Sequence, residues 1–281
     1  MKKAEIRELD FILRKAFDED AVFGDVTSAA LNLNKKIDAV IVSKQDCCLC
    51  GAAFLPRIFE KRDKRITVRL LKKDGGTVLE GQAVCRIRGQ AGSVLSAERV
   101  SLNFLGFLSG IAAKTRKFME LVSERWSFPV KPVILDTRKT IPGLRYLSKY
   151  AVRCGGGKNH RFNLKEIIMV KDNHLAAAGL ERVLKKLEGK KVIFETDSIN
   201  DARRILRIRP FVLLCDNLSP SGVSAVIALK NKISPATLIE ISGGINEKSI
   251  LNFSRLAVDR ISIGALTHSA VAMDFSLEVI R

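Results

Sequence analysis

Short apolar runs that alternate with helical segments constrain the fold of this chain more than any other feature. The runs occupy residues 133–135, 167–170, 192–194, 212–214, 238–241 and 260–263. Helical patterns at 176–187, 199–207 and 221–230 separate several of them. Strands that alternate with helices in this way are typical of parallel βαβ units, so the sequence predicts a parallel sheet from about residue 130 onward.

Polar or glycine residues follow each apolar run directly. They occupy positions 136–139, 171–174, 195–197, 216–217, 242–244 and 264. In parallel α/β barrels the functional groups lie at the carboxyl ends of the strands, so six such ends would surround one pocket. An open doubly wound sheet is the alternative, but it needs a topological switch point, and nothing in the sequence marks one.

The first hundred residues mix helix and strand patterns. We expect a helix over 4–17, strands over 36–44, 66–71 and 83–88, and a long helix over 96–121. Turn signals at 74–76 and 81 separate the later strands. This part of the chain therefore predicts an α+β region that precedes the barrel.

The chain carries a net charge of +18, and the charge is uneven. Residues 1–110 hold 19 Lys and Arg against 14 Asp and Glu, whereas residues 111–281 hold 29 against 16. A nucleic-acid surface and an enzyme for polyanionic small molecules are both compatible with this balance. Aromatic residues make up 6%, and none is interleaved with basic residues as a base-stacking platform requires.

Neither a membrane span nor a disulfide framework is expected. No stretch of 18 apolar residues free of charge occurs, and the charged N-terminus lacks the apolar centre of a signal peptide, so we expect a cytoplasmic protein without a membrane partner. Three of the six cysteines, at 47, 48 and 50, are too close together for ordinary zinc spacing, and no histidine is nearby. The cysteines are Cys47, Cys48, Cys50, Cys85, Cys154 and Cys215, and we expect free thiols.

Three basic segments are candidates for anion binding. Arg138 and Lys139 follow the first apolar run, and an arginine fork can pair both oxygens of a carboxylate while lysine acts as a mobile point charge. Three glycines at 155–157 free the backbone to form an anion-binding nest, after which His160 and Arg161 add donors. Lys171 opens the third segment. Each segment is also compatible with a solvated or flexible loop.

Two acidic residues, Glu195 and Asp216, follow neighbouring runs within this basic surrounding. They could hold Mg²⁺ through oxygen ligands and water, or stabilise positive charge on a sugar ring during glycosyl transfer. Salt bridges to local Lys and Arg are the simpler alternative. Near the last runs, the residues Ser242, Gly243, Gly244, Ser262 and Gly264 are of the types that capture phosphate through backbone N–H groups.

Taken together, eight segments resemble the quinolinate phosphoribosyltransferase family, also called nicotinate-nucleotide pyrophosphorylase (carboxylating). The resemblance covers nearly the whole chain in the right order. The segments are GDVTS (24–28), SAERVSLNFLGFLSGIA (96–112), DTRKTIPGLR (136–145), AVRCGGGKNHRFNL (151–164), KDNH (171–174), CDN (215–217), EISGGI (240–245) and DRISIGALTHSA (259–270).

The resemblance implies a fold and an activity. It implies an incomplete α/β barrel with an N-terminal α+β sandwich domain, in a homodimer, or a hexamer built from it, whose sites lie at the subunit interface. We expect residues 1–112, joined by 270–281, to form the N-terminal domain and 113–269 the catalytic barrel. The implied reaction converts quinolinate and phosphoribosyl pyrophosphate, with Mg²⁺, to nicotinate mononucleotide, carbon dioxide and pyrophosphate.

The resemblance also implies roles for individual residues. Those that match quinolinate-binding positions are Arg138, His160, Arg161 and Lys171, and Lys139 matches a lysine near substrate and phosphate. Glu195 and Asp216 match carboxylates that face the ribose and Mg²⁺, so the implied catalytic set is Lys139, Lys171, Glu195 and Asp216. Arg99 matches an arginine supplied by the partner subunit. The phosphate-binding loops match at Ser242, Gly243, Gly244, Ser262 and Gly264.

The chain departs from the family pattern at two positions. Ile193 stands where the family has the first glutamate of a Glu-x-Glu pair, and Asn163 stands where glycine is common. A related group in molybdenum-transport operons shares the 136–140 segment but lacks KDNH, so residues 171–174 favour the biosynthetic enzyme. That paralogue and a basic nucleic-acid-binding protein remain the alternatives.

Overall fold

The computed structural model describes residues 3–280 of the chain. These residues form two compact units. Within the described residues, unit 1 comprises the chain up to Arg116, Thr140–Gly156 and the chain from Leu266 onward, and unit 2 comprises Lys117–Lys139 and Gly157–Ala265. The connection from the first to the second strand of the parallel sheet therefore contains a segment, Thr140–Gly156, that belongs to unit 1, whereas the sequence places all of 113–269 in the barrel.

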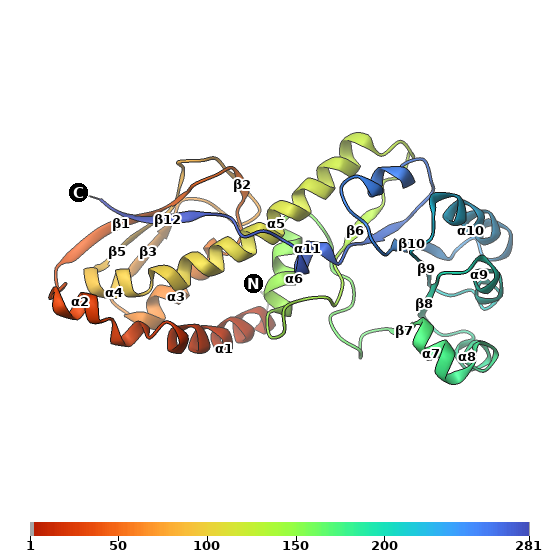
Figure 1. Ribbon diagram of the computed structural model, residues 1–281, viewed down its shortest axis with the longest axis horizontal. Coiled ribbons are helices and arrows are strands. Elements are labelled where there is room, and N and C mark those ends of the chain that lie inside the picture. The colour runs from red at the N-terminus through yellow and green to blue at the C-terminus, as the bar shows by residue number, and fades with distance from the viewer. Residues whose placement is uncertain (1–2, 281) are drawn as a thin grey trace. The chain divides into compact units, whose positions relative to one another are not determined.

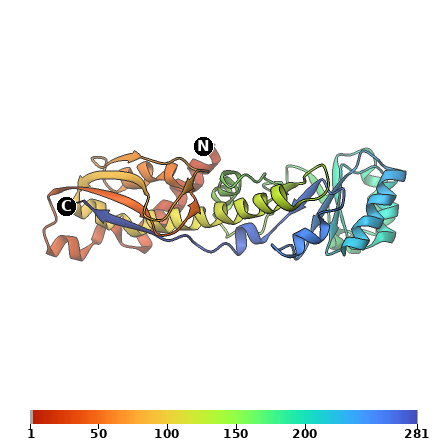
Figure 2. The same ribbon diagram turned by 90° about the horizontal axis from the view of Figure 1, so that it is seen from above.

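A four-stranded antiparallel sheet forms the centre of unit 1. Its strands are β1 (Lys36–Ser43), β3 (Thr67–Leu70), β5 (Ala83–Gln90) and β12 (Phe275–Val279), in the order β12-β1-β5-β3. The C-terminal strand β12 thus pairs with β1, which lies over 230 residues earlier in the chain (Figures 1 and 2). Two short strands, β2 (Cys47–Cys48) and β4 (Thr77–Val78), form a separate ladder.

Helices cover this sheet and complete unit 1. They are α1 (Lys3–Glu19), η1 (Val22–Gly24), α2 (Val26–Ala30), η2 (Ala52–Phe54), α3 (Leu55–Arg62), α4 (Ala91–Ser96), α6 (Arg145–Cys154) and most of α5 (Glu98–Arg125). The helix predicted at 4–17 is confirmed as α1, which buries Leu9, Leu13 and Phe17 at a spacing of four residues. Glu8 of α1 accepts hydrogen bonds from the first backbone N–H groups of α6, at Tyr146 (3.0 Å) and Leu147 (2.7 Å).

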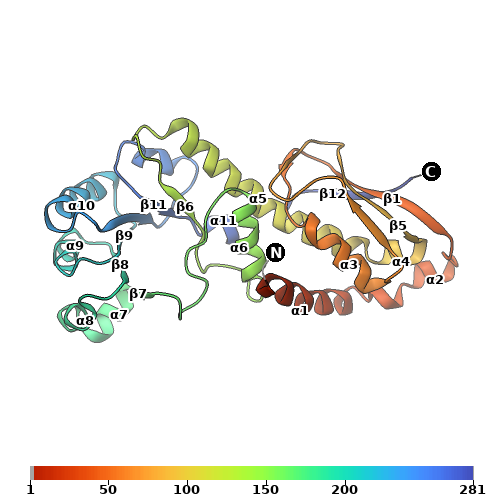
Figure 3. The same ribbon diagram turned by 180° about the vertical axis from the view of Figure 1, so that it is seen from behind.

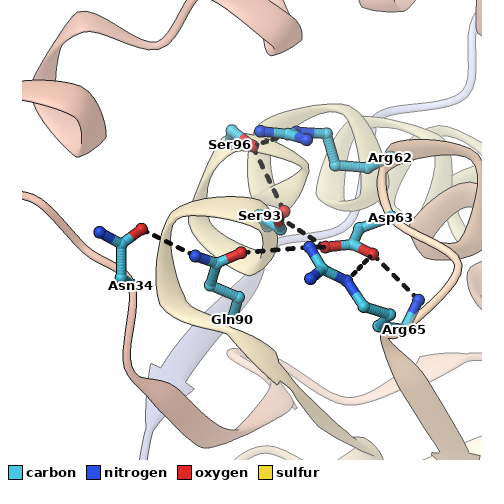
Figure 4. A network of polar contacts seen from close by, with 7 residues as sticks. All are labelled: Asn34, Arg62, Asp63, Arg65, Gln90, Ser93 and Ser96. Carbon is cyan, nitrogen blue, oxygen red and sulfur yellow. Dashed lines mark hydrogen bonds and ion pairs between the residues drawn. The ribbon is translucent and has the colours of Figure 1, made fainter.

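A polar network fixes α4, the helix that leads into Arg99 (Figure 4). Asp63 at the end of α3 accepts from Arg65 and from Ser93 of α4 (3.1 Å), while Arg62 donates to Ser96 (2.8 Å). The hydrogen bond from Arg65 lowers the pKa of Asp63 well below its usual range, so this anchor stays ionised at neutral pH. The remaining members of the network are Gln90 and Asn34.

Unit 2 is built on a six-stranded parallel sheet. The strands are β6 (Val133–Leu135), β7 (Ile168–Val170), β8 (Val192–Thr196), β9 (Val212–Asp216), β10 (Leu238–Ser242) and β11 (Arg260–Ser262). The helical segments after the strands are α7 (Asp172–Ala178), α8 (Leu180–Leu187), α9 (Ile199–Leu206), α10 (Pro220–Ile233), η3 (Ser249–Phe253) and α11 (Ala265–His268), of which α11 lies mostly in unit 1.

The strand order, β6-β11-β10-β9-β8-β7, confirms an incomplete barrel. From β7 to β11 each strand lies beside the next one in the chain, and β6 then pairs with β11 (Figure 3). Within residues 3–280, β6 and β7 are edges that do not pair with each other, so the sheet stays open there. A doubly wound sheet would instead reverse its order at a switch point.

The apolar character of the runs follows from burial on both faces of the sheet. One face packs Ile193, Val212 and Leu214 together. The helix layer contributes Ile205 of α9 and Val226 of α10, both fully buried. A parallel strand covered on two sides needs a continuous apolar sequence, which explains why these strands do not alternate.

Two helix predictions differ from the structure. The segment 176–187 is two helices, because Gly179 adopts a positive φ of 76° between α7 and α8. Helix α7 also begins four residues earlier than expected, directly at the end of β7. The helix predicted at 96–121 is divided between α4 and α5 at Ala97. None of the helices in residues 3–280 has both the length and the apolar character to cross a membrane.

Candidate active site

The carboxyl ends of the six parallel strands of unit 2 present polar side chains at one edge of the sheet. Because parallel strands all end on the same side, these residues face a common region. In the register of the sheet, Ser242 pairs with Asp216 and Ser262 pairs with Leu135, so the ends of these strands lie at the same level. The residues that follow or close the strands are Asp136, Lys171, Glu195, Asp216, Ser242 and Ser262.

Asp136, fully buried after β6, anchors the end of the glycine-rich loop. Its Oδ1 accepts from the backbone N–H of His160 (2.9 Å), and its Oδ2 accepts from the Asn159 side chain. Lys158 N–H donates to Ile134 O (2.9 Å), which extends the pairing of β6 by one bridge. The carboxylate therefore brings two basic segments, 138–139 and 160–161, to the same strand end.

His160 and Arg161 are both 8% exposed, and their orientation is set by protein contacts. His160 Nδ1 accepts from the backbone N–H of Arg161 (2.8 Å), so the ring proton lies on Nε2, which is 3.4 Å from Glu240 Oε1. The Arg161 guanidinium donates to Ile167 O (3.3 Å). These contacts hold Arg161 in place, while the imidazole faces the interior of the sheet.

Arg138 and Arg161 are close enough to affect each other's charge. Burial lowers the pKa of Arg161, the positive charge of Arg138 lowers it further, and the negative charge of Glu195 raises it. Arginine nevertheless stays protonated in proteins. Two guanidinium groups gathered in this way favour an anionic ligand, because such a ligand relieves their mutual repulsion.

Lys171 and Glu195 form an ion pair between the ends of β7 and β8. The Lys171 side chain is 42% exposed, whereas that of Glu195 is 12% exposed. The backbone N–H of Lys171 donates to His174 Nδ1 (2.9 Å), so His174 caps the first turn of α7. The salt bridge that the sequence offered as the simpler alternative for Glu195 is therefore present, and it places a cation beside that carboxylate.

Asp216 closes β9 and accepts from the Asn217 side chain (3.0 Å). Asn217 has a positive φ of 55°, and its backbone N–H donates to Ser242 O (3.0 Å). The strand ends of β9 and β10 are thereby joined. The sequence placed Asn217 among the polar residues at the strand ends, but its conformation was not predicted, although asparagine is one of the few residues that enter this backbone region readily.

The loop after β10 requires glycine at position 243. Its φ is +88°, and a Cβ atom there would lie 2.2 Å from Asn217 Oδ1. Gly244 also has a positive φ, of 59°. Ser262 is buried at the end of β11, and Gly264 directly precedes α11. Successive residues with positive φ are the backbone conformation in which neighbouring N–H groups can form an anion nest, so the predicted phosphate role of these glycines stays a prediction.

The buried pair Glu240 and Arg260 was missed in the sequence. Glu240 is fully buried in β10, and its Oε2 lies 2.9 Å from Arg260 Nε of the neighbouring strand β11. Burial alone would raise the pKa of Glu240, but hydrogen bonding from His160 and the charge of Arg260 lower it. A glutamate inside the apolar run 238–241 was the available signal, because a charge inside a buried strand needs partners.

Lys139 and Arg99 are both exposed. Lys139 N–H donates to Thr137 Oγ1 (3.0 Å), a local turn that keeps Arg138 and Lys139 on one loop. Arg99 belongs to unit 1, in the first turn of α5. There it lines a surface pocket of about 340 Å³ together with Asp20 and Asp25.

The departure at position 193 has a structural explanation. Ile193 is 1% exposed and packs against Val212 and Leu214. A carboxylate at this position would be buried among apolar side chains and would need a partner. The loss of the first glutamate therefore extends the apolar layer below Glu195.

Comparison with known proteins places this arrangement in a family. Residues 111–278 match the family model "Quinolinate phosphoribosyl transferase, C-terminal domain", and residues 25–109 match "Quinolinate phosphoribosyl transferase, N-terminal domain". These two matches together span most of the chain.

Individual relatives agree with the family match. A protein of Archaeoglobus fulgidus named "Probable nicotinate-nucleotide pyrophosphorylase [carboxylating]" is 39% identical over 264 residues, which cover 92% of this chain and 99% of the relative. A Bacillus subtilis protein of the same name is 38% identical, covering 97% and 93%. The solved nicotinate-nucleotide pyrophosphorylase from Francisella tularensis superposes with a TM-score of 0.89 at 32% identity, covering 98% of this chain and 96% of that one. The chain belongs to the quinolinate phosphoribosyl transferase family.

Proposed function

We propose that this protein transfers the phosphoribosyl group of phosphoribosyl pyrophosphate to quinolinate and decarboxylates the product to nicotinate mononucleotide. The observation that carries the proposal is the gathering of Arg138 and Arg161 with Glu195, itself paired with Lys171, at the carboxyl edge of the unit 2 sheet. A site made of cations alone could bind many different anions. Carboxylates among them suit a reaction in which positive charge develops on a sugar.

Quinolinate is a dianion, and the arginine pair accounts for its binding. Two planar guanidinium groups can each take a carboxylate through two parallel hydrogen bonds. Lys171 adds a point charge that can exchange between Glu195 and the ligand. The contacts of His160 with Arg161 and Glu240 favour a positioning role for this histidine, which holds Arg161 toward the ligand.

Phosphoribosyl pyrophosphate needs an anion site at the neighbouring strand ends. Ser242, Gly243 and Gly244, with Ser262 and Gly264, are the groups that we assign to its phosphates. The positive φ angles of Gly243 and Gly244 support this assignment, because they turn backbone N–H groups outward. Lys139, exposed on the adjacent loop, supplies a mobile charge for the pyrophosphate.

The donor set at β8 and β9 fits Mg²⁺. Glu195 and Asp216 are hard oxygen ligands on neighbouring strands, and Mg²⁺ prefers one or two carboxylates with water and phosphate oxygens. Bound there, the ion would neutralise charge on the departing pyrophosphate. Asn217 holds one oxygen of Asp216, which leaves the other oxygen of that carboxylate for a ligand.

The chemistry that follows needs no covalent nucleophile. The quinolinate nitrogen forms a bond to C1 of the ribose as the C1–pyrophosphate bond breaks, and Glu195 and Asp216 stabilise the positive charge on the ring. The nitrogen is then positively charged. Loss of carbon dioxide from the adjacent carbon leaves an electron pair that this charge stabilises until a proton is taken up.

We further propose a homodimer, or a hexamer built from dimers, in which Arg99 enters the site of the partner subunit. Arg99 is exposed in unit 1, which supports a role in contact with another chain. We expect the enzyme to act in the cytoplasm. The molybdenum-linked and nucleic-acid-binding alternatives are less favoured, because the relatives that match nearly the full chain are named as nicotinate-nucleotide pyrophosphorylases.

The test is direct. The purified protein is incubated with quinolinate, phosphoribosyl pyrophosphate and Mg²⁺, and nicotinate mononucleotide is measured by mass spectrometry. We expect product only when all three are present, and loss of product on chelation with restoration by added Mg²⁺. Absence of product from a folded protein would refute the proposed activity, and activity unaffected by chelation would refute the metal.

A further inference from the structure

A cluster of potential metal ligands lies in unit 1, apart from every residue assigned above. One ligand atom each of Cys50, Asp74 and Cys154 lies within 4.8 Å of the other two. The residues come from three separate parts of the chain: the segment after β2, the turn before β4, and the last residue of α6. Zinc bonds sulfur at about 2.3 Å and oxygen at about 2.0 Å, so side chains this close can converge on one ion by small rotations.

The backbone around the two cysteines is held by hydrogen bonds. Cys50 N–H donates to Ser109 Oγ (2.9 Å), and the same hydroxyl donates to Cys50 O (3.0 Å). Gly75 N–H donates to Leu49 O (2.8 Å), which ties the Asp74 turn to the cysteine segment. Arg116 donates to both Gly75 O (3.0 Å) and Gly155 O (3.3 Å), so one guanidinium joins that turn to the end of α6.

The Asp74 carboxylate is oriented by two donors. Ala52 N–H donates to Oδ1 (2.9 Å) and Tyr150 Oη donates to Oδ2 (2.7 Å). Carboxylates that bind a metal are commonly oriented by such hydrogen bonds, and each oxygen keeps a free lone pair.

Cysteine binds a metal as the thiolate, and both cysteines of the cluster are free thiols in the described residues. Cys48 lies beside the cluster, where its thiol donates to the backbone carbonyl of Cys154 at 3.7 Å.

We propose that Cys50, Cys154 and Asp74 bind Zn²⁺, with the fourth tetrahedral position left to water. Thiolates select zinc over magnesium and calcium, and three protein ligands with a water complete a tetrahedral zinc site. The spacing of the cysteines at 47, 48 and 50 argued against a zinc site in the sequence. The fold, however, brings Asp74 and Cys154 to Cys50 from other parts of the chain. The ion would fasten the end of α6, where the glycine-rich loop that leads to His160 begins.

The experiment uses the full-length wild-type protein, reduced and freed of metal, and then titrated with Zn²⁺ or Co²⁺. We expect one zinc ion per chain after dialysis, and a strong near-ultraviolet thiolate-to-cobalt absorption that added Zn²⁺ removes. Zinc should also protect Cys154, the more exposed sulfur, from alkylation. These readouts need neither a variant nor catalytic activity.

Variants assign the ligands. Cys50→Ser and Asp74→Asn should each weaken zinc binding at least 10-fold, whereas Cys85→Ala, which removes a buried cysteine of the same unit outside the cluster, should bind as the wild type does. The proposal is overturned if the wild-type protein gives no thiolate-to-cobalt absorption. It is also overturned if Cys50→Ser and Asp74→Asn retain wild-type affinity, or if the pair forms a Cys50–Cys154 disulfide and the reduced protein holds no zinc.

Discussion

Arg260 Nε lies 2.9 Å from Glu240 Oε2 between the neighbouring parallel strands β11 and β10, and Glu240 is fully buried. His160 Nε2 approaches the other carboxylate oxygen at 3.4 Å. This buried group joins the last strands of the sheet to the residue that orients Arg161. The site therefore depends on an ion pair beneath it, as well as on the groups that face the substrate.

Glu240→Gln should destabilise the protein by about 3 kcal/mol at neutral pH, because the variant leaves Arg260 without its counter-charge in a buried position. The pKa of Glu240 is lowered in the folded state, so its stabilisation is present above the ordinary value of 4.5 and is lost as pH falls through the folded pKa. Urea unfolding across pH measures this. The difference from wild type should be constant near pH 7 and shrink below pH 4.5.

The control for this prediction is Glu188→Gln, at an exposed glutamate of the same unit. It should leave the unfolding free energy within about 0.5 kcal/mol of wild type. The stabilising role of the Glu240–Arg260 ion pair is contradicted if Glu240→Gln is as stable as the wild type. It is also contradicted if the difference in unfolding free energy grows toward acid pH.

Arg138→Ala should lower kcat/KM for quinolinate by about 10- to 100-fold or more, since a charged hydrogen bond contributes about 1.5–3 kcal/mol. Arg138→Lys should restore little, because lysine cannot make the planar two-point contact. Steady-state kinetics measure both. Arg203→Ala, at an exposed arginine of α9, is the matched control and should retain wild-type turnover. Full turnover by folded Arg138→Ala would refute the role of Arg138.

Gly243→Ala should raise KM for phosphoribosyl pyrophosphate more than KM for quinolinate. The new methyl group would lie 2.2 Å from Asn217 Oδ1 and would displace the loop that we assign to phosphate. Gly81→Ala is the control, because Gly81 also has a positive φ (+77°) but no atom within 4 Å of the added Cβ. It should lose only about 1 kcal/mol of stability and keep both KM values. Equal effects of the two substitutions would show that strain, not the loop contact, is responsible.

Arg99→Ala and Arg138→Ala should complement each other if Arg99 acts in the partner's site. Each homodimer would be inactive, but a mixed dimer contains one site with both arginines. After subunit exchange in equal amounts, the mixture should recover about a quarter of wild-type activity. Mixing either variant with itself provides the baseline. No recovery, despite mixed dimers detected by native mass spectrometry, would place Arg99 in its own subunit's site or outside any site.

The sequence was most informative where burial controls the pattern. The apolar runs located the strands of unit 2, and the polar residues after them located Glu195 and Asp216, because a parallel sheet places all carboxyl ends on one edge. Pairings between distant residues were not predictable. Nothing local to Cys50 indicates Asp74 or Cys154, and Glu240 gave only the signal of a charge in an apolar strand, without its partner.

Backbone conformation was the second feature that could not be predicted from the sequence. Gly179 lies in a segment whose apolar period continues through it, so the break between α7 and α8 depends on a positive φ that the pattern does not encode. The positions of Arg138 and Arg161 followed from motif resemblance, but their proximity depends on Asp136, which holds the 158–160 segment beside β6. Local sequence thus supplied the candidate groups of the site, and buried hydrogen bonds determine how they meet.

In the proposed reaction one site both transfers the phosphoribosyl group and removes a carboxylate. Quinolinate labelled with carbon-13 at the carboxyl group next to the ring nitrogen tests it in a single reaction with phosphoribosyl pyrophosphate and Mg²⁺. We predict labelled carbon dioxide and unlabelled nicotinate mononucleotide in equal amounts. A nucleotide that retains both carboxylates, or no nucleotide from the folded protein, would contradict the claim.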